Sequence, residues 1–390
     1  MLQLCISQEI TNKPYTFKAT GIRVFSIEEA LYHAYHYWRE SVDEFLSHNL
    51  SDWVASLGHS NITAKMKDVT ALKPLSKRLL AFLNIIEYFN ESELAKLKAD
   101  LAHWENRVEW EKLKDRADNL ESRGEPAKAL PLYGRALSYE ENIPLLNNMA
   151  IANMQLSNHR EAVKLLAKAR AAEPENMAIN LHYAEAAILN GDYEDAKKAL
   201  EKVSAYHSNA EKSSSSRETA DILYLHGLMA YQQKDYSTAL NSFNQAVAQN
   251  PNESHYTYKI ADVYMHMRQY DKALDILKQS PGGPHHIKMA EVYAAYGHAH
   301  MPEAIRHIRQ AISQGGPNEA ALWTKLAEYY RKDYDCQRAD NAITNALPSK
   351  SVAALLENAR IKKGLGRMRE YRAGLSEALK GLKERYREGG

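Results

Sequence analysis

Small residues recur along this 390-residue chain at a spacing close to 34 residues. One series consists of Ala129, Ala162, Ala196, Ala239, Ala273, Ala304 and Ala339, with steps of 33, 34, 43, 34, 31 and 35 residues. A second series follows the first by seven residues, and a third precedes it by about twelve. Bulky side chains there would keep helices from the roughly 8–10 Å interaxial distance of close packing. The three series therefore predict a stack of repeated helix pairs.

Turn-forming residues lie between these positions, as helix pairs require. Gly124-Glu125-Pro126 and Gly191-Asp192-Tyr193 fall between two helices of a pair. Pro174, Pro251 and Pro317 fall between pairs, where a helix cannot continue. Glycine and proline are otherwise scarce, with 17 and 12 copies, so the chain lacks the turns that an all-β sandwich or barrel needs.

Two stretches carry a fuller pattern of residues. They comprise Leu223, Gly227, Tyr236, Ala239, Phe243, Ala246 and Pro251, and Trp323, Leu326, Ala327, Tyr330, Ala339, Ile343 and Ala346. This pattern resembles the tetratricopeptide repeat, a family of 34-residue helix-turn-helix units, over about residues 106–385. We count eight units, which begin near Trp110, Ile143, Met177, Ala220, Ser254, Gly283, Ala320 and Val352. The resemblance implies an all-α fold, a right-handed α-solenoid, for residues 106–390.

Two places depart from the regular spacing. The step of 43 residues indicates a nine-residue insertion within residues 206–217, which include the serine run Ser213–Ser216. An exposed loop is expected there, with phosphorylation of the serines as an alternative interpretation. The sixth unit contains about two extra residues around His298–His300.

Residues 1–105 show no repeat phase, and we predict a small, mostly helical N-terminal module. Segments 2–6 and 23–25 are candidates for a minor strand pair, and Ser26-Ile27-Glu28-Glu29 matches a capping box that opens a helix through Trp38. Further helices are predicted at residues 41–47, 51–57, 60–68 and 75–88.

No glycine or proline interrupts residues 92–123. Leucines and tryptophans at helical spacing run through this stretch and pass into the first repeat. We therefore expect one continuous helix that couples the module rigidly to the repeats. A break near Asn106-Arg107, giving a hinge, is the alternative.

Composition excludes several function classes. A formal net charge of +1 gives no general signal for nucleic-acid binding. Cys5 and Cys336 are the only cysteines and are far apart, so neither a disulfide framework nor a zinc ribbon is expected. No run of 18 apolar residues and no leader-like N-terminus occurs, so we expect a cytoplasmic protein without membrane insertion. Residues 360–390 hold ten Lys/Arg and four Asp/Glu, which predicts a polar capping helix or, alternatively, a basic edge for a ligand.

No motif of an enzyme is found among the nucleotide-binding, metalloprotease and nucleophile-elbow patterns, so we expect no catalysis and no cofactor. The chain has sixteen histidines, including a group in the sixth unit. A metal site or an enzyme built on His285, His286, His298, His300 and His307 is a minor alternative. Packing of histidines between helices is the expected role.

The resemblance also implies a binding surface. In this family, defined positions of each unit's first helix line the concave face, where an extended peptide or partner protein is held. Asparagine side chains can bond a peptide backbone there, and tyrosines give contact area at low entropy cost. The residues at these positions are Asn147, Asn148, His182, Glu185, Tyr224, Tyr231, Tyr258, Lys259, Asp262, His266, Lys288, Glu291, Lys325, Glu328 and Arg331.

Chaperone-binding members of the family hold a terminal carboxylate with lysine, asparagine and arginine side chains. Lys114 and Asn148 match this clamp, but Asp118, Ala178 and His182 replace three of its residues. An acid facing the pocket would repel a carboxylate, so this subclass is not expected.

These observations favour a non-catalytic interaction scaffold or adaptor. The layout of a small N-terminal module before seven or eight repeats also resembles bacterial peptide-sensing regulators, so a signal-responsive regulator is the alternative. The sequence leaves the identity of the partner open, and self-association is one possibility.

Overall fold

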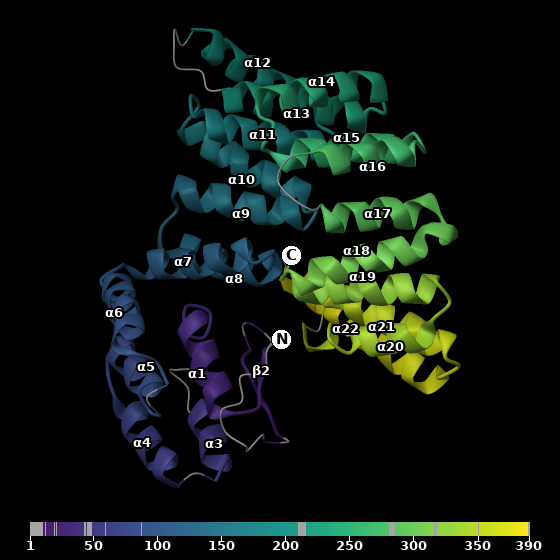
Figure 1. Cartoon of the computed structure of the whole chain (residues 1–390). Coiled ribbons are helices and arrows are strands. Elements are labelled where there is room, and N and C mark those ends of the chain that lie inside the picture. Colours follow the sequence, from purple (N-terminus) through teal and green to yellow (C-terminus); the bar gives the residue numbers. More distant parts are fainter. Residues whose placement is uncertain are drawn as a thin grey trace. The chain divides into compact units, whose positions relative to one another are not determined.

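The computed structural model of the chain (Figure 1) describes residues 11, 13–18, 20, 22–42, 44, 49–58, 60–86, 88–209, 216–280, 285–315, 318–349 and 351–388. Within these residues the secondary structure is helical except for one two-stranded sheet. The chain divides into two compact units, Met1–Asn148 and Met149–Gly390. The all-α, helix-pair fold predicted from the sequence is confirmed. The predicted boundary between residues 1–105 and 106–390 rests on repeat phase and stays a prediction.

The first unit begins with a short hairpin and a helix. Strands β1 (Tyr15–Thr16) and β2 (Arg23–Val24) pair antiparallel. Helix α1 (Ile27–His36) follows, and the Ser26 hydroxyl accepts a hydrogen bond from the backbone N–H of Glu29 at 3.2 Å. The helix start predicted from the capping box is confirmed, although the helix ends two residues before the predicted end. The predicted strand at residues 2–6 lies outside the described residues.

Three short helices and a longer one complete the N-terminal part of this unit: α3 (Asn49–Ser56), α4 (Ser60–Ala71), α5 (Leu75–Leu83) and α6 (Glu91–Glu105). Phe17, Leu31, Leu83 and Leu101 are fully buried at the centre of the core they share. The predicted helix at residues 41–47 lies mostly outside the described residues. The helices predicted at residues 51–57 and 60–68 match α3 and α4 to within three residues at each end, whereas the helix predicted at 75–88 ends five residues earlier, at Leu83.

The expectation of one continuous helix across residues 92–123 is wrong. Helix α6 ends at Glu105, and α7 (Glu109–Ser122) begins after an extended residue, Val108, whose N–H bonds to the Glu111 carboxylate at 3.3 Å. Arg107 lies in the break and pairs with Asp115 of α7 at 3.2 Å.

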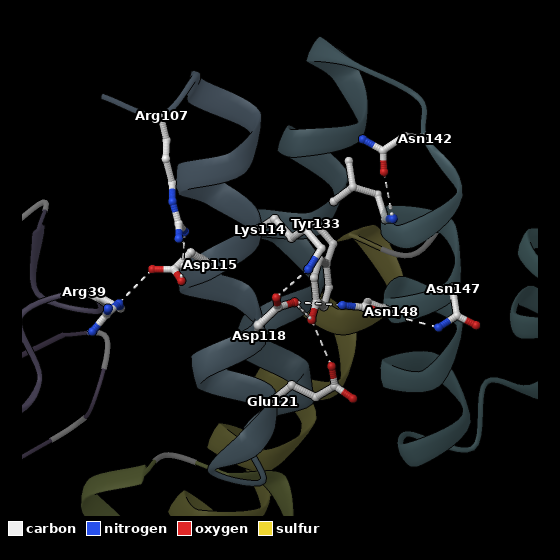
Figure 2. Close-up of polar contacts among 11 residues, drawn as sticks. Arg39, Arg107, Lys114, Asp115, Asp118, Glu121, Tyr133, Asn142, Asn147 and Asn148 are labelled. Atoms are coloured by element: carbon white, nitrogen blue, oxygen red, sulfur yellow. Dashed lines mark hydrogen bonds and ion pairs between the residues drawn. The ribbon is translucent and has the colours of Figure 1, made fainter. Parts of the chain in front are cut away.

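Ion pairs also join the N-terminal part to α7 within the first unit. Arg39 lies 2.7 Å from Asp115 (Figure 2), and Arg123 lies 2.9 Å from the buried carboxylate of Glu40. The Arg123 guanidinium also lies 3.9 Å from the centre of the Tyr37 ring. The break therefore does not separate a free module from the repeats, because charged contacts bridge it.

Helix α7 pairs with α8 (Pro126–Tyr139), and the boundary between the two compact units falls inside α9 (Ile143–Gln155). The second unit then continues through α10 (His159–Ala172), α11 (Met177–Asn190), α12 (Tyr193–Asn209), α13 (Ser216–Gln232), α14 (Tyr236–Gln249), α15 (Ser254–His266), α16 (Tyr270–Gln279), α17 (His286–Tyr296), η1 (His298–His300), α18 (Met301–Ser313), α19 (Glu319–Lys332), α20 (Cys336–Ile343), η2 (Leu347–Ser349), α21 (Val352–Gly364) and α22 (Met368–Glu388). The helices that open pairs begin within four residues of the predicted unit starts.

The predicted departures have structural counterparts. The extra residues of the sixth unit form the short 3-10 helix η1, which follows Gly297 at φ 140°. Residues 206–209 extend α12 and residues 216–217 open α13, so the ends of the predicted loop are helical rather than extended. The middle of the serine run lies outside the described residues.

The small-residue series lie where the helices of a pair meet. Ala162, Ala196, Ala239 and Ala273 are fully buried. In the second unit the first helices of successive pairs also contact each other, from α11 through α13 and α15 to α17, and again from α19 to α21. This row of first helices, visible in Figure 1, carries most of the predicted binding residues.

Candidate functional site

The structure places all predicted binding residues on the first helices of their pairs. Asn147 and Asn148 lie on α9 in the first unit, and the remaining thirteen lie on α11, α13, α15, α17 and α19 of the second. Each unit is therefore a separate candidate surface.

A polar cluster in the first unit centres on Asp118 of α7 (Figure 2). One carboxylate oxygen accepts hydrogen bonds from the Tyr133 hydroxyl at 2.7 Å and from the Asn148 amide at 2.9 Å. The other oxygen lies 2.6 Å from the Lys114 ammonium. Burial raises the pKa of Tyr133, and the hydrogen bond to Asp118 and the nearby carboxylates add to this shift.

Asp118 thus pairs with Lys114, the residue whose position matches a clamp lysine of chaperone-binding family members. Asn148 is engaged by the same acid, and Asn147 lies 3.5 Å from the Asn148 side-chain oxygen. The two predicted binding asparagines of α9 belong to an internal hydrogen-bond network. This arrangement agrees with the sequence argument against a chaperone-tail clamp.

Five predicted residues in the second unit form what we call the charge ladder: Lys259 and Asp262 on α15, Lys288 and Glu291 on α17, and Lys325 on α19. Lys259 lies 3.6 Å from Asp262, and Lys288 contacts Asp262 and lies 3.0 Å from Glu291. Lys325 closes the series by contacting Glu291. The charges alternate in sign across three pairs, and the side chains are 16–32 % exposed.

The pairing controls the protonation of the ladder. Burial by itself would lower the pKa of Lys288, but Asp262 and Glu291 outweigh it and raise that pKa. Burial would likewise raise the pKa of Glu291, but Lys288 and Lys325 outweigh it and lower that pKa. The pairing therefore favours the charged forms of Lys288 and Glu291, and the ladder is made of three basic and two acidic side chains.

Arg331, at the end of α19, extends the polar contacts to the next pair. Its guanidinium contacts Glu357 of α21, whose side chain is only 3 % exposed and also accepts from Arg360 at 3.2 Å. Glu328 instead pairs with Lys332 on its own helix at 2.6 Å. Glu357 was not predicted as a site residue from the sequence. The only indication there is an acidic residue among the apolar residues that open α21.

Tyr224 of α13 is a core residue of the second unit. It is 8 % exposed, and its ring lies 5.7 Å from that of Phe243, 5.5 Å from that of Tyr256 and 4.8 Å from that of His255. Its replacement by alanine would therefore remove core packing as well as any partner contact.

Two further predicted residues, His182 and Glu185, lie on α11, and burial together with the Glu185 charge raises the pKa of Tyr224. Burial raises the pKa of Glu185, and His255 and Lys259 oppose that shift. Burial also lowers the pKa of His182. A half-buried acid near Lys259 is suited to a hydrogen-bonding or charge-paired role rather than to apolar contact.

The other predicted rings lie along α13 and α15. The Tyr231 and His266 rings meet edge to face at 5.4 Å, and His266 is exposed. The Tyr258 hydroxyl lies 2.9 Å from Nδ1 of His285, which is buried. Tyr231 and Tyr258 are half-buried, so both offer surface to a partner.

The histidines of the sixth unit form packing contacts. Nδ1 of His286 lies 2.8 Å from Nδ1 of His307, and Arg306 lies 2.9 Å from Nε2 of His307. Burial and the Arg306 charge lower the pKa of His307 to about 4, so both rings are neutral at pH 7. Across the described part of the chain, no group of three or more His, Cys, Asp or Glu side chains is arranged to hold a metal ion.

None of the described helices combines the length and apolar character needed to cross a membrane.

Comparisons with known proteins follow the repeat pattern. One tetratricopeptide-repeat family model matches residues 153–212 and 230–285, and a second matches residues 190–240. No curated protein matches the chain.

Among solved structures, a tetratricopeptide repeat protein from Parabacteroides merdae is 16 % identical, with a TM-score of 0.44 over 69 % of this chain and 98 % of that chain. The Cut9–Hcn1 hetero-tetramer of the APC/C is 15 % identical, with a TM-score of 0.42 over 90 % of this chain and 68 % of that chain. MamA from Desulfovibrio magneticus is 19 % identical, with a TM-score of 0.32 over 44 % of this chain and 92 % of that chain. The family models, together with the observed helix pairs, show that residues 153–285 of this chain consist of tetratricopeptide repeats.

Proposed function

We propose that this chain is a non-catalytic interaction scaffold and that the first helices of its second unit bind an extended segment of a partner protein. The charge ladder on α15, α17 and α19 is the observation that carries the proposal. It joins Lys259, Asp262, Lys288, Glu291 and Lys325 in one half-buried series on successive first helices.

The ladder suits an extended partner for two physical reasons. Long charged side chains lose rotamer freedom when a partner fixes them, at about 0.5–1.5 kcal/mol each, and mutual pairing has already restricted these five. Their ammonium groups and carboxylates also alternate, which complements the alternating C=O and N–H groups of an extended backbone. The half-buried rings of Tyr231 and Tyr258 add contact area beside the ladder.

The experiment compares a ladder variant with a control of equal charge. The ladder variant is Lys259→Ala with Lys325→Ala, which removes the two terminal cations. The control is Lys164→Ala with Lys198→Ala, which removes two cations from the second helices α10 and α12, where the side chains are 62 % and 70 % exposed. Each of these four lysines forms an ion pair in the folded chain.

Affinity capture from the source cell, quantified by mass spectrometry, provides the measurement. Proteins retained by the wild type and the control but lost from the ladder variant would support the proposal. An unchanged set of captured proteins for the ladder variant would contradict it, provided that circular dichroism shows equal helicity. No contact among the described residues favours the signal-responsive regulator over the scaffold, so we propose the scaffold alone.

A further inference from the structure

Helix α22, drawn in yellow beside α21 in Figure 1, packs against α21 and sorts its exposed side chains by type. Residues four or seven positions apart lie on one line along a helix. On α22 this spacing gives three neighbouring lines, and a mostly basic line separates a line with apolar ends from an acidic one. In order around the helix, the lines are Met368, Arg372 and Leu379; Arg369, Ser376 and Lys380; and Glu370 and Glu377.

The cations of this surface are Arg369, Arg372 and Lys380, and all three are exposed. None of them forms an ion pair with another residue of the described part of the chain. Glu370 pairs instead with a lysine of α21 at 3.4 Å. Glu377 lies three residues before Lys380, but these two described side chains form no ion pair. The three positive charges are therefore available to a partner.

The surplus of positive charge remains when the acids of the neighbouring helices are counted. Residues 360–390 contain ten Lys/Arg and four Asp/Glu. Helices α20 and α21 add one acid each, Asp340 and Glu357. Asp340 pairs with Lys362 at 2.6 Å and with Arg367 at 3.2 Å, so its charge is already compensated. With both acids included, ten basic residues stand against six acidic ones.

Exposed apolar side chains border the cations on one side. Met368 is 45 % exposed and Leu379 is 56 % exposed. Both lie on the line of Arg372, one about a turn before it and the other about two turns after it. Leu375, four residues before Leu379, is half-buried, so apolar surface extends from this line toward the core. Free cations and exposed apolar groups therefore share one face of the helix.

We propose that this face of α22 binds the surface of a membrane that contains anionic phospholipids. The headgroups attract Arg369, Arg372 and Lys380, and each cation should strengthen binding about fivefold. Met368 and Leu379 would enter the boundary between headgroups and acyl chains, as the apolar side chains of interfacial helices do. The acidic line lies beyond the basic one, on the side away from the apolar residues, and need not approach the headgroups. Such contact lies beyond the proposed scaffold function and needs no helix that crosses the membrane.

Nucleic acid is the competing partner for a basic surface. Its phosphates would attract the same cations, but affinity there comes from phosphate contacts, to which exposed methionine and leucine side chains add nothing. A lipid surface uses both kinds of side chain. The apolar residues beside the cations are therefore the observation that favours lipid.

The first experiment is sedimentation of the full-length chain with vesicles. Phosphatidylcholine vesicles are compared with vesicles in which about 30 mol % of the lipid is phosphatidylserine. Binding should be at least about 20-fold tighter to the anionic vesicles, because three cations contribute. Duplex DNA and poly-glutamate are offered at the same concentration of anionic groups. Equal binding to the two kinds of vesicle, no binding to either, or tighter binding to DNA or poly-glutamate would overturn the proposal.

A triple variant and a matched control locate the surface. Replacing Arg369, Arg372 and Lys380 by glutamine should weaken binding to anionic vesicles by about 100-fold, about fivefold for each cation. The control carries Lys164→Gln, Lys198→Gln and Lys278→Gln, which remove the same charge from second helices where the side chains are 62 %, 70 % and 53 % exposed. It should bind like the wild type. Equal affinities of the two triple variants would refute this location.

A single apolar change tests the mode of contact. Leu379→Ser keeps every charge and should weaken vesicle binding by about 3- to 10-fold, because less apolar surface leaves water. Vesicle binding unchanged by Leu379→Ser would contradict entry of this side chain into the lipid. Circular dichroism should show wild-type helicity in every variant, because all the replaced side chains are exposed. No residue of the charge ladder is changed, so the membrane surface and the proposed scaffold surface can fail independently.

Discussion

Gly227 provides the sharpest test of how the helix pairs pack. It lies within α13 and faces Phe243 of α14, which is fully buried. A Cβ atom at position 227 would lie 2.7 Å from two carbon atoms of the Phe243 ring. Ordinary contacts between carbon atoms are about 3.5–4.0 Å, so the ring would have to move by about 1 Å, and protein cores are close-packed.

Two effects of Gly227→Ala oppose each other. Alanine in a helix interior is favoured over glycine by about 1 kcal/mol. Overpacking a well-packed core costs about 1–3 kcal/mol. Because the obstructing atoms belong to a rigid buried ring rather than to a flexible side-chain end, the second effect should prevail. We expect the free energy of unfolding to fall by about 1–2 kcal/mol.

Gly134→Ala is the matched control. This glycine also lies inside a helix, α8, but no atom lies within 4 Å of its added Cβ, so the replacement should stabilise the chain by about 0.5–1 kcal/mol. Urea denaturation gives both free energies. Because the two glycines lie in different compact units, hydrogen exchange of residues 216–249 and 126–139 then assigns each change to its unit.

A double-mutant cycle tests the stated cause. Phe243→Leu removes the ring and should destabilise the chain alone, but on that background Gly227→Ala should no longer be harmful and should recover up to about 1 kcal/mol. If Gly227→Ala stabilises the otherwise wild-type chain, or if the two changes are additive, the close approach of glycine and ring is not what this position requires.

Two further predictions concern buried charge. Acidification from pH 6.5 to 4 should destabilise both units, because burial lowers the pKa of His33 to about 3 and that of His307 to about 4, whereas the unfolded chain takes up these protons near pH 6.5. This contribution to stability is complete above pH 6.5 and is lost below it, by about 3 kcal/mol per histidine at pH 4. The urea midpoint should therefore fall with decreasing pH, and it should fall less steeply in His307→Gln than in the wild type. A midpoint that does not change with pH, or an equally steep fall in the variant, would contradict this. Glu357→Gln should lower the free energy of unfolding in urea by about 2–4 kcal/mol, because it leaves Arg331 without its buried partner. Glu328→Gln, at a more exposed pair, should change it by less than about 0.5 kcal/mol. Equal effects of the two changes would contradict the importance of the buried pair.

The positions of the repeats could be predicted from the sequence because each unit carries small residues at the same positions. Ile143, Met177, Ser254 and Val352 each begin both a predicted unit and an observed helix. A steric requirement imposed at each helix contact leaves small residues at a regular spacing, and chance does not reproduce this spacing along several series.

The break between α6 and α7 could not be predicted in the same way. Neither glycine nor proline marks Asn106-Arg107, and helix propensity alone favours continuity. The break depends instead on tertiary contacts, because Arg107 pairs with Asp115 while Trp104 packs edge to face against Trp38 at 5.5 Å. The contact between the two tryptophans joins residues 66 positions apart, and a local sequence pattern carries no record of it.

A cavity in the first unit could not be predicted from the sequence for a related reason. Its rings are Tyr32 and Tyr35 of α1 and Tyr88 and Phe89, which precede α6, and these two segments have no shared period. In the sequence, Tyr32 and Tyr35 look like ordinary helix residues, because no local pattern shows that Tyr88 and Phe89 lie beside them in the structure. A count of 24 tyrosines and 6 phenylalanines hints at aromatic surfaces, but it does not show which rings meet.

The charge ladder shows why repeats disclose their fold more readily than their ligand. The position that faces a ligand on one first helix also faces the first helix of the next pair, so a lysine there has two possible partners. In this chain Lys288 contacts Asp262 and Glu291. Because these charges are compensated internally, their sum gives little long-range preference between an acidic and a basic partner. The choice between partners should then depend on the rings beside the ladder, such as Tyr231 and His266. These rings would contact a partner at short range, where the fit of shapes decides which partner binds.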